Sequence, residues 1–254
     1  MQLDDGSGEL ALRINEGAEK VPSFKGSKLG KAADTAGAPV RLENTGDDLT
    51  TFGQGLSPFF LSLSLWFGGL ILFMVFNPIS RRAIDSGTNP ARVVMGSWIP
   101  AVLVGLVQAF NLWVVQAFVL KVDPVHPVQM LLSLGFIAAV FNTAILAIYA
   151  LFGPSMGRLI TMVLMSLQLV ASNGLYPPEV QPDFIQWVHS WDPMRFSVDL
   201  MRHTLFGTLP GDNRVEVAMV VLGAVGVVSF LLAMLGFWKE RVLMEKDIHP
   251  ELDV

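Results

Sequence analysis

Long apolar runs separated by short polar breaks make up most of the chain after its first fifty residues. A helix needs about 20 apolar residues to cross the hydrocarbon core of a bilayer. The second run starts at Val93 and contains Pro100, so it fits one tilted helix or a helix broken at the proline, and we place its membrane helix from about Ser97. The pattern predicts five transmembrane helices, at about 57–76, 97–120, 128–152, 159–176 and 217–238.

Two short amphipathic helices are predicted between the fourth and fifth spans. Asp183 is placed to cap a helix over 184–191, and Asp192-Pro193 ends that helix and starts a second one. We expect this hairpin to lie in the outer membrane–water interface, either as a structural belt or as a gate that moves during substrate passage. The first helix has an apolar face of Phe184, Val188 and Trp191, and the second has an apolar face of Met194, Val198, Met201 and Leu205 opposite Arg195, Asp199 and Arg202.

Composition agrees with an all-α integral membrane protein. Hydrophobic residues make up 52% of the chain and charged residues 15%. The net charge of −5 gives no indication of a nucleic-acid-binding face, and the absence of cysteine excludes disulfides, thiolate metal sites and thiol catalysis. We divide the chain into an extracytoplasmic polar tail or linker (1–54), a five-span membrane domain (55–241) and a cytoplasmic tail (242–254).

None of the five predicted spans contains Asp, Glu, Lys, Arg or His. Ion-coupled carriers usually bury an ionisable group as a relay, so any transport by these helices needs energy from another molecule. The spans do contain amides and hydroxyls, which indicate either hydrogen bonding between helices or a polar path for a headgroup. They include Gln108, Asn111, Gln116, Asn142, Thr143, Gln168, Ser172 and Asn173.

Small residues recur every four positions in two of the spans. They are Ala101, Gly105 and Ala109 in the second span, and Ala139, Thr143 and Ala147 in the third. Such rows allow helix backbones to approach closely, and they indicate packing within the bundle or, as the alternative, the seam of a homodimer.

Basic residues predict the orientation. Arg81, Arg82 and Arg92 lie between the first two spans, Arg158 lies between the third and fourth, and further basic residues follow the fifth. Because short cytoplasmic loops are enriched in Lys and Arg, these regions are expected inside, with the amino terminus outside and the carboxy terminus in the cytoplasm. Residues 1–50 contain no signal-peptide pattern, so we expect a preceding span in an amino-terminal half or partner subunit.

Catalytic chemistry is not indicated. His126, His189 and His203 fall at separate loop positions, and neither a zinc-protease helix nor a nucleophile elbow is present in the sequence. We therefore expect no enzyme activity, no metal and no cofactor.

Two blocks of sequence resemble one protein family. Residues 52–68, FGQGLSPFFLSLSLWFG, match the pattern YGxGxxPYFxSLxLWxG, and the second block is LQLVASNGLYPPEVQPDF followed by DPMRFSVDLMRHTLFG. Both are similar to the carboxy-terminal membrane half of the phage infection protein (Pip/YhgE) family, which is related to type-2 ABC exporter permeases. Members of that family usually begin with a membrane span and a large extracytoplasmic helical domain, and we expect this sequence to correspond to the part that follows them. It also has SNGLYP where SGGTFP-like sequences are common.

This resemblance implies a multi-pass protein of the bacterial plasma membrane that works as a permease-like component and helps export an envelope substrate. It also implies a separate cytoplasmic ATPase, with Arg81 and Arg82 as the contact. The alternative is an envelope receptor or scaffold in phage adsorption or specialised protein secretion. The residues expected to matter are Pro58, Trp66 and Gly68 at the first span, and Asn173, Gly174, Tyr176, Pro177, Glu179, Asp192, Pro193, Asp199 and Arg202 at an outer turn or gate.

Overall fold

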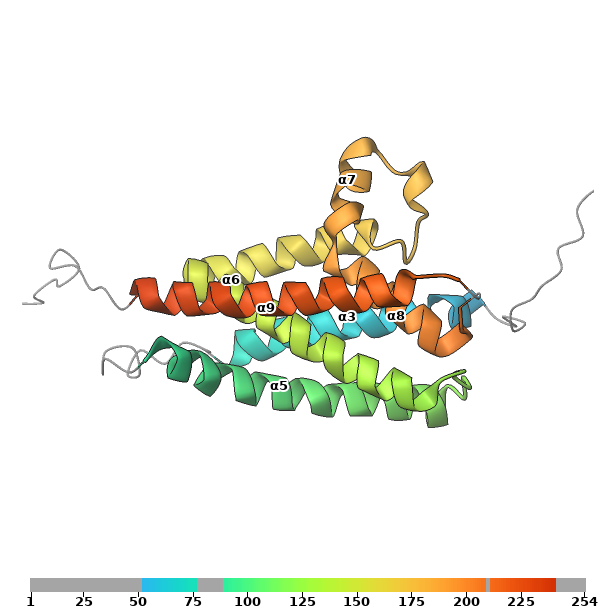
Figure 1. Cartoon of the computed structure of the whole chain (residues 1–254), viewed down its shortest axis with the longest axis horizontal. Helices are drawn as coiled ribbons and strands as arrows, with labels where there is room; N and C mark the ends of the chain where they lie inside the picture. The colour runs from blue at the N-terminus through green and yellow to red at the C-terminus, as the bar shows by residue number, and fades with distance from the viewer. Residues whose placement is uncertain (1–51, 77–88, 209–210, 241–254) are drawn as a thin grey trace, which may run out of the picture. The chain divides into compact units, whose positions relative to one another are not determined.

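The computed structural model describes residues 52–76, 89–208 and 211–240, all of which lie in one compact unit, Gly46–Val254. Most of these residues are helical and none is in a strand, which confirms the all-α prediction (Figure 1). Arg81, Arg82 and most of the two predicted tails lie outside the described residues. The elements are α3 (Phe52–Val75), α5 (Pro90–Val114), the π-helix η1 (Val115–Val119), α6 (Pro127–Ala171), the 3₁₀ helix η2 (Pro178–Val180), α7 (Asp183–Trp191), α8 (Pro193–Phe206) and α9 (Arg214–Glu240).

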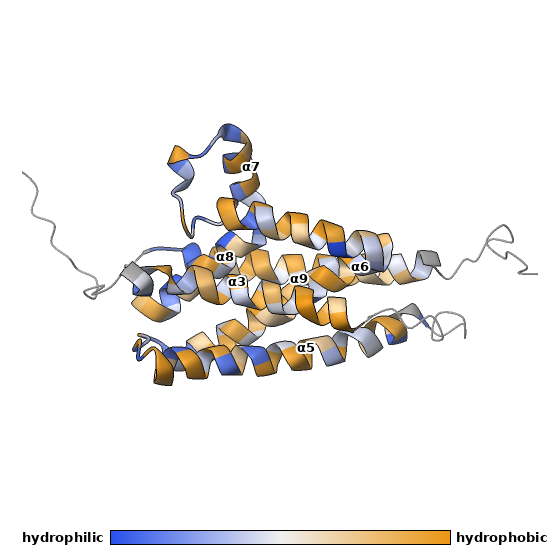
Figure 2. Ribbon diagram, turned by 180° about the vertical axis from the view of Figure 1, so that it is seen from behind, coloured by the Kyte–Doolittle hydropathy of each residue, from blue (hydrophilic) through white to orange (hydrophobic). Residues whose placement is uncertain are grey.

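Four helices of the described part are long and apolar enough to cross a membrane, namely Gly53–Val75, Ala91–Val119, Pro127–Ala171 and Arg214–Trp238. Most of the apolar surface of α5 and α9 faces outward, where Figure 2 shows hydrophobic residues. Exposed apolar surface on this scale is unfavourable in water and is expected on a protein surrounded by lipid. The side chains in the centre come mainly from α3, α6 and α8.

Helix α6 reverses direction near its middle. Gly153 has φ 75° and ψ 172°, outside the helical region. Residues 149 and 157 would be about 12 Å apart along a straight helix at 1.5 Å per residue. Instead, a Cβ added to Gly157 would lie 3.0 Å from the Cα of Tyr149. The predicted third and fourth spans are therefore two legs of α6 joined at Gly153 (Figure 1).

Contacts at both ends of α6 support the same geometry. Before the first leg, His126 N donates to Thr204 O near the end of α8. At the end of the second leg, Arg202 of α8 donates to Asn173 O. A straight helix of 45 residues would hold its ends about 65 Å apart, whereas α8 has 14 residues and is about 20 Å long. The two ends of α6 approach the same short helix because the chain turns back.

Glycines and amides join α3, α5 and the first leg of α6. The Gln108 side chain on α5 lies directly against Gly68 and donates to Ser64 O at 2.6 Å. Asn142 on α6 lies between Gly69 and Gly105, and a Cβ on Gly69 would be 2.8 Å from Asn142 Oδ1. The row of Ala101, Gly105 and Ala109 therefore packs inside the bundle, as expected from its spacing. Interhelical hydrogen bonding accounts for Gln108 among the predicted amides.

Helix α5 begins earlier than the membrane helix placed from Ser97. Asn89 caps it by accepting from Ala91 N at 3.1 Å, and Pro90 occupies the first turn, where its missing N–H costs nothing. Pro100 lies inside the continuous helix, so the helix is not broken there. At the other end, the π-turn Val115–Val119 buries Gln116. The fourth predicted span also ends early, because α6 stops at Ala171 rather than at Tyr176.

Helices α7 and α8 form as predicted, with two differences. Pro182 occupies the N-cap position of α7, and Asp183 is the first helical residue without a capping hydrogen bond, so the predicted cap at Asp183 is wrong. The apolar face of α8 is buried and packs against α3, α6 and α9, so it is not free to lie in a lipid interface. An amphipathic pattern records the apolar face but not whether lipid or protein covers it. In contrast, α7 projects from the bundle (Figure 1).

Candidate functional site

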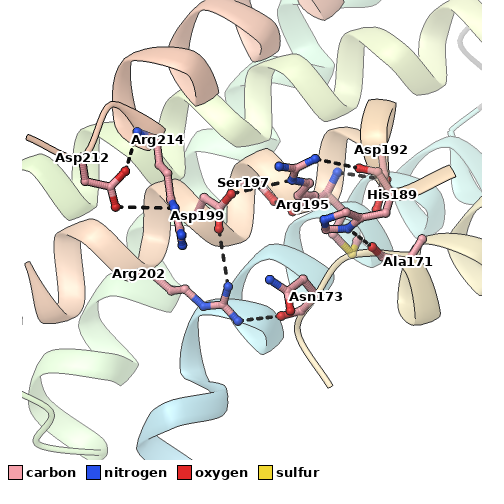
Figure 3. A network of polar contacts seen from close by, with 11 residues as sticks. Ala171, Asn173, His189, Asp192, Arg195, Ser197, Asp199, Arg202, Asp212 and Arg214 are labelled. Carbon is pink, nitrogen blue, oxygen red and sulfur yellow. Dashed lines mark hydrogen bonds and ion pairs between the residues drawn. The ribbon is translucent and has the colours of Figure 1, made fainter. Parts of the chain in front are cut away.

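Most of the predicted site residues meet where the second leg of α6 turns into α7 and α8. We call residues 172–206 the α6–α8 junction. Its polar network is shown in Figure 3. Asn173 ends the helix with φ 58°, a left-handed conformation that asparagine tolerates better than most residues. Gly174 lies against the Phe59 ring of α3, so closely that an added Cβ would collide with it. The turn is therefore packed onto the start of α3.

Arg202 joins the turn to α8. Its Nη2 donates to Asn173 O at 2.6 Å, and its Nη1 lies 3.4 Å from Asp199 Oδ1. Arg195 Nε is 4.0 Å from the other Asp199 oxygen, so one carboxylate is shared by two arginines. The side chain of Asp199 is 11% exposed, against about a third for each arginine. This triad leaves one positive charge beside the turn (Figure 3).

Asp192 is the most deeply buried acidic residue of the junction, at 1% exposure. Its Oδ1 accepts from Met194 N at 3.1 Å and caps α8, as the Asp192-Pro193 pair predicted. Burial raises the pKa of Asp192 to about 7, with the backbone amides of Met194 and Arg195 and the Arg195 charge opposing that rise. The other carboxylate oxygen, Oδ2, has no hydrogen-bond partner among the described residues.

His189 connects α7 to the end of α6. Its Nδ1 lies 2.6 Å from Ala171 O, and because a carbonyl only accepts, Nδ1 must carry the proton. Arg195 Nη1 donates to His189 O at 3.3 Å, which links this contact to the arginine–aspartate triad. This hydrogen bond fixes the His189 ring between α7 and the end of α6.

Gln181 holds the loop between α6 and α7. Its Nε2 donates to Val170 O at 2.9 Å and to Tyr176 O at 3.0 Å. The predicted residues Tyr176 and Glu179 are exposed on this loop, and Pro177 precedes η2. Sequence reasoning missed Gln181, and the signal that could have found it is a lone amide within a proline-rich loop whose backbone needs partners.

Two histidines predicted to be separate lie together. The rings of His126 and His203 are 5.1 Å apart, brought there by backbone hydrogen bonds between the residues before α6 and the end of α8. His203 Nδ1 also lies 2.6 Å from Thr208 Oγ1. Partial burial and then the neighbouring His126 lower the pKa of His203. No group of three or more potential metal ligands occurs within the described ranges.

The three residues singled out on α3 have different neighbours. Pro58 lies in the first turns of α3 and its carbonyl accepts from Ser62 Oγ at 2.9 Å. Trp66 is buried edge-on against Phe141, with ring centroids 5.1 Å apart. Gly68 packs against the Gln108 side chain of α5. These residues position α3 in the bundle, and the ring of Phe59 touches the junction at Gly174.

Comparison with known proteins identifies a family. Residues 13–235 match the family described as ABC-2 family transporter protein. The chain is also 29% identical over 168 residues to the protein described as "Uncharacterized protein YhgE" of Bacillus subtilis (strain 168). That alignment covers 65% of this chain and 21% of the relative, so the chain spans about a fifth of the relative's length. With its long apolar helices, this multi-pass membrane protein belongs to the ABC-2 transporter family and is related to YhgE.

Proposed function

We propose that the chain is the membrane part of an exporter of a cell-envelope substrate and that a separate cytoplasmic ATPase powers it. The observation that carries this proposal is family membership over residues 13–235, combined with five predicted spans that hold no Asp, Glu, Lys, Arg or His. Helices without a proton or cation relay need an external source of energy. A carrier role also accounts for the absence of catalytic geometry in the described part, and we propose that the chain is not itself an enzyme.

In this proposal α6 crosses the bilayer twice, which gives five crossings. Its two legs, on either side of Gly153, are each about the length of a membrane span. The junction and the residues before α6 then share one face of the bilayer, because His126 N bonds to the end of α8. We place that face outside, in a bacterial plasma membrane, with the amino terminus outside and the carboxy terminus in the cytoplasm, as the basic loops favour.

Engineered cysteines test the topology without background, because the sequence contains no cysteine. Asp123→Cys, Asp183→Cys and Ser155→Cys each introduce one thiol at an exposed position. With a membrane-impermeant maleimide applied to intact cells, positions 123 and 183 should react and position 155 should react only after lysis. Labelling of 123 and 183 from opposite faces would show that α6 crosses once and would overturn the five-span arrangement.

Copurification tests the energy source. The chain, tagged and cross-linked in its native membrane, should recover a nucleotide-hydrolysing subunit. Arg81→Gln/Arg82→Gln should reduce that recovery, because these residues are the proposed contact. The matched control is Lys121→Gln/Arg214→Gln, which removes the same charge from the opposite side in this topology. Purification of the chain without any ATPase would contradict the proposal. An equal loss of ATPase recovery in the two double variants would contradict it as well.

One observation favours the alternative of a receptor or scaffold. Phe184, Trp187 and Trp191 form an exposed aromatic row on the projecting α7, with centroids 6.2 and 5.4 Å apart along the row. Trp187 is 62% exposed. If the protein acts by docking, Trp187→Ala should abolish binding of its envelope partner while Arg81→Gln/Arg82→Gln leaves function intact. If the protein is an exporter, Arg81→Gln/Arg82→Gln should abolish function and Trp187→Ala should leave it intact.

A further inference from the structure

A groove of about 510 Å³ lies between α5 and α9, with the first leg of α6 as its floor. This volume is in the range of about 300–1,000 Å³ that small-molecule sites occupy. The side chains at its edges are exposed, among them Met95 on α5 and Val227 and Leu231 on α9. The groove therefore opens on the apolar surface that faces lipid.

Two glycines of α9 leave this space open. An added Cβ on Gly223 would have no atom within 4 Å, and one on Gly226 would be 3.4 Å from a Val140 methyl group, an ordinary contact. Gly236 on the same helix differs, because backbone of α6 leaves no room for a side chain there. Glycine is unfavourable inside a helix, and close packing does not explain it at Gly223 or Gly226.

The polar atoms of the groove are already used within the protein. Of the residues that line it, only Trp98 and Thr143 carry polar side-chain atoms. Trp98 Nε1 donates to Thr143 Oγ1 at 2.7 Å, and that hydroxyl donates to Ala139 O at 2.6 Å. A polar ligand placed here would lose its hydrogen bonds to water without replacement, whereas hydrocarbon loses nothing. The lining therefore favours a hydrocarbon chain.

The length of the site corresponds to one leaflet of a bilayer. Helices α5 and α9 run antiparallel in Figure 1, and the rings of Trp98 and Phe230 lie 6.0 Å apart, which places these two residues at one level. At about 1.5 Å per residue, Arg92 lies about 9 Å from that level toward the start of α5, and Gly223 lies about 10 Å from it in the opposite direction. The resulting distance of about 20 Å is close to half of a bilayer about 40–45 Å thick with its headgroups.

A positive charge lies at the headgroup end of this site. Arg92 is exposed and forms no ion pair with another described residue. It precedes Met95 by three residues, so the two share one face of α5. Arginine is well suited to phosphate, and the start of α5 adds the partial positive charge of a helix amino terminus. The arrangement combines an anion-binding side chain with an apolar groove below it.

We propose that this groove binds an acyl chain of an anionic phospholipid, whose phosphate lies at Arg92 and whose chain runs toward Gly223. In the topology proposed above, this lipid belongs to the cytoplasmic leaflet. A helix of a second copy would instead extend through both leaflets, whereas the groove occupies one. Lipid binding needs no ATPase, so it goes beyond the proposed export function and can be tested separately from it.

Photolabelling with lipid probes tests this site. The full chain is placed in phosphatidylcholine nanodiscs, without ATP, that contain a trace of phosphatidylglycerol with a diazirine near the end of one acyl chain. Phosphatidylcholine with the same chains is the matched probe. Mass spectrometry of peptides locates the labels, and excess unlabelled phosphatidylglycerol removes only labelling at a saturable site. We expect such labelling at 223–231, about fivefold stronger with the anionic probe, as one basic residue near the headgroups should give.

Two variants with matched controls assign the labelling to the groove. Arg92→Gln should reduce labelling by the anionic probe about fivefold, to the level of phosphatidylcholine, whereas Arg158→Gln removes an exposed charge outside the groove and should change nothing. Gly223→Leu fills the deep end and should abolish saturable labelling by both probes. Gly53→Leu on α3, where an added Cβ also meets no atom within 4 Å, should leave labelling unchanged.

Two outcomes would overturn the proposal. Equal saturable labelling by both probes, unchanged by Arg92→Gln, would show that the groove accepts any lipid chain and that the arginine does not select the headgroup. Protection of 223–231 from both probes, together with cross-linked dimers, would show that a second copy covers the groove. Because Arg92 is exposed, Arg92→Gln decides the headgroup preference even if Gly223→Leu lowers the yield of folded protein.

Discussion

Replacing Gly236 with alanine tests how closely α9 packs against α6. A Cβ at this position would lie 2.5 Å from the carbonyl oxygen and 2.6 Å from the carbonyl carbon of Ala150. Both distances are well inside van der Waals contact, and the obstacle is backbone, which cannot rotate away as a long side chain can. The two helices must therefore move apart to accept one methyl group.

The size of the effect follows from a matched pair on one helix. Overpacking of this kind costs about 1–3 kcal/mol. Glycine to alanine in a helix also gains up to about 1 kcal/mol in propensity. Gly223→Ala shares that gain, and no atom lies within 4 Å of its added Cβ. The difference in unfolding free energy between the two variants therefore isolates the overpacking, about 1–3 kcal/mol.

Thermal unfolding in nanodiscs, followed by tryptophan fluorescence, measures this difference. One kcal/mol shifts the Tm by about 2–4 °C for a domain of 150–250 residues. Gly236→Ala should therefore melt about 2–12 °C below Gly223→Ala. Equal melting temperatures would refute the reasoning, because they would mean that α6 and α9 do not approach through their backbones at Gly236.

Three further predictions concern the junction and the reversal. Burial raises the pKa of Asp192 from 3.8 to about 7, so this group stabilises the fold most below pH 4 and loses that contribution as the pH rises to about 7. The loss amounts to about 4 kcal/mol, at about 1.4 kcal/mol for each pH unit. Asp192→Asn should flatten this part of a Tm–pH profile. The lowered pKa of His203 has the opposite sign: its contribution is present above pH 6.5 and lost as the pH falls further, and His203→Gln should remove that loss. Gly153→Ala places a Cβ in a conformation that is almost exclusive to glycine and should cost about 1–3 kcal/mol in unfolding measurements, whereas Gly96→Ala in open space should not; equal stabilities would contradict the bend.

Local features of the fold could be predicted from sequence, because they depend on neighbouring residues. The length and hydropathy of each apolar run predicted where the long helices lie, although α5 starts before Ser97 and α6 ends before Tyr176. The cap of α8 was predictable because an aspartate before a proline is a strong helix start. At α7 the same reasoning chose Asp183 and failed, because proline precedes it and occupies the cap position.

Features that depend on distant residues could not be predicted in this way. The pairing of His126 with His203 requires the residues before α6 to meet the end of α8, which no short-range pattern records. The burial of α8 was missed because its apolar face would look the same against lipid as against protein. Arg202 was selected as part of an outer turn, but its bond to Asn173 O became visible only with the fold.

Two glutamines in the spans have opposite hydrogen-bonding outcomes in the fold. Gln108 lies against Gly68 and donates to a backbone carbonyl, so helix packing fully explains it. Gln168 is more deeply buried, at 4% exposure, and its side-chain oxygen has no hydrogen-bond partner among the described residues. An unpaired buried polar atom costs about 1–3 kcal/mol, against the 5–15 kcal/mol by which proteins are typically stable. The sequence pattern could not tell these two amides apart, because whether a buried amide finds a partner depends on residues that are distant along the chain.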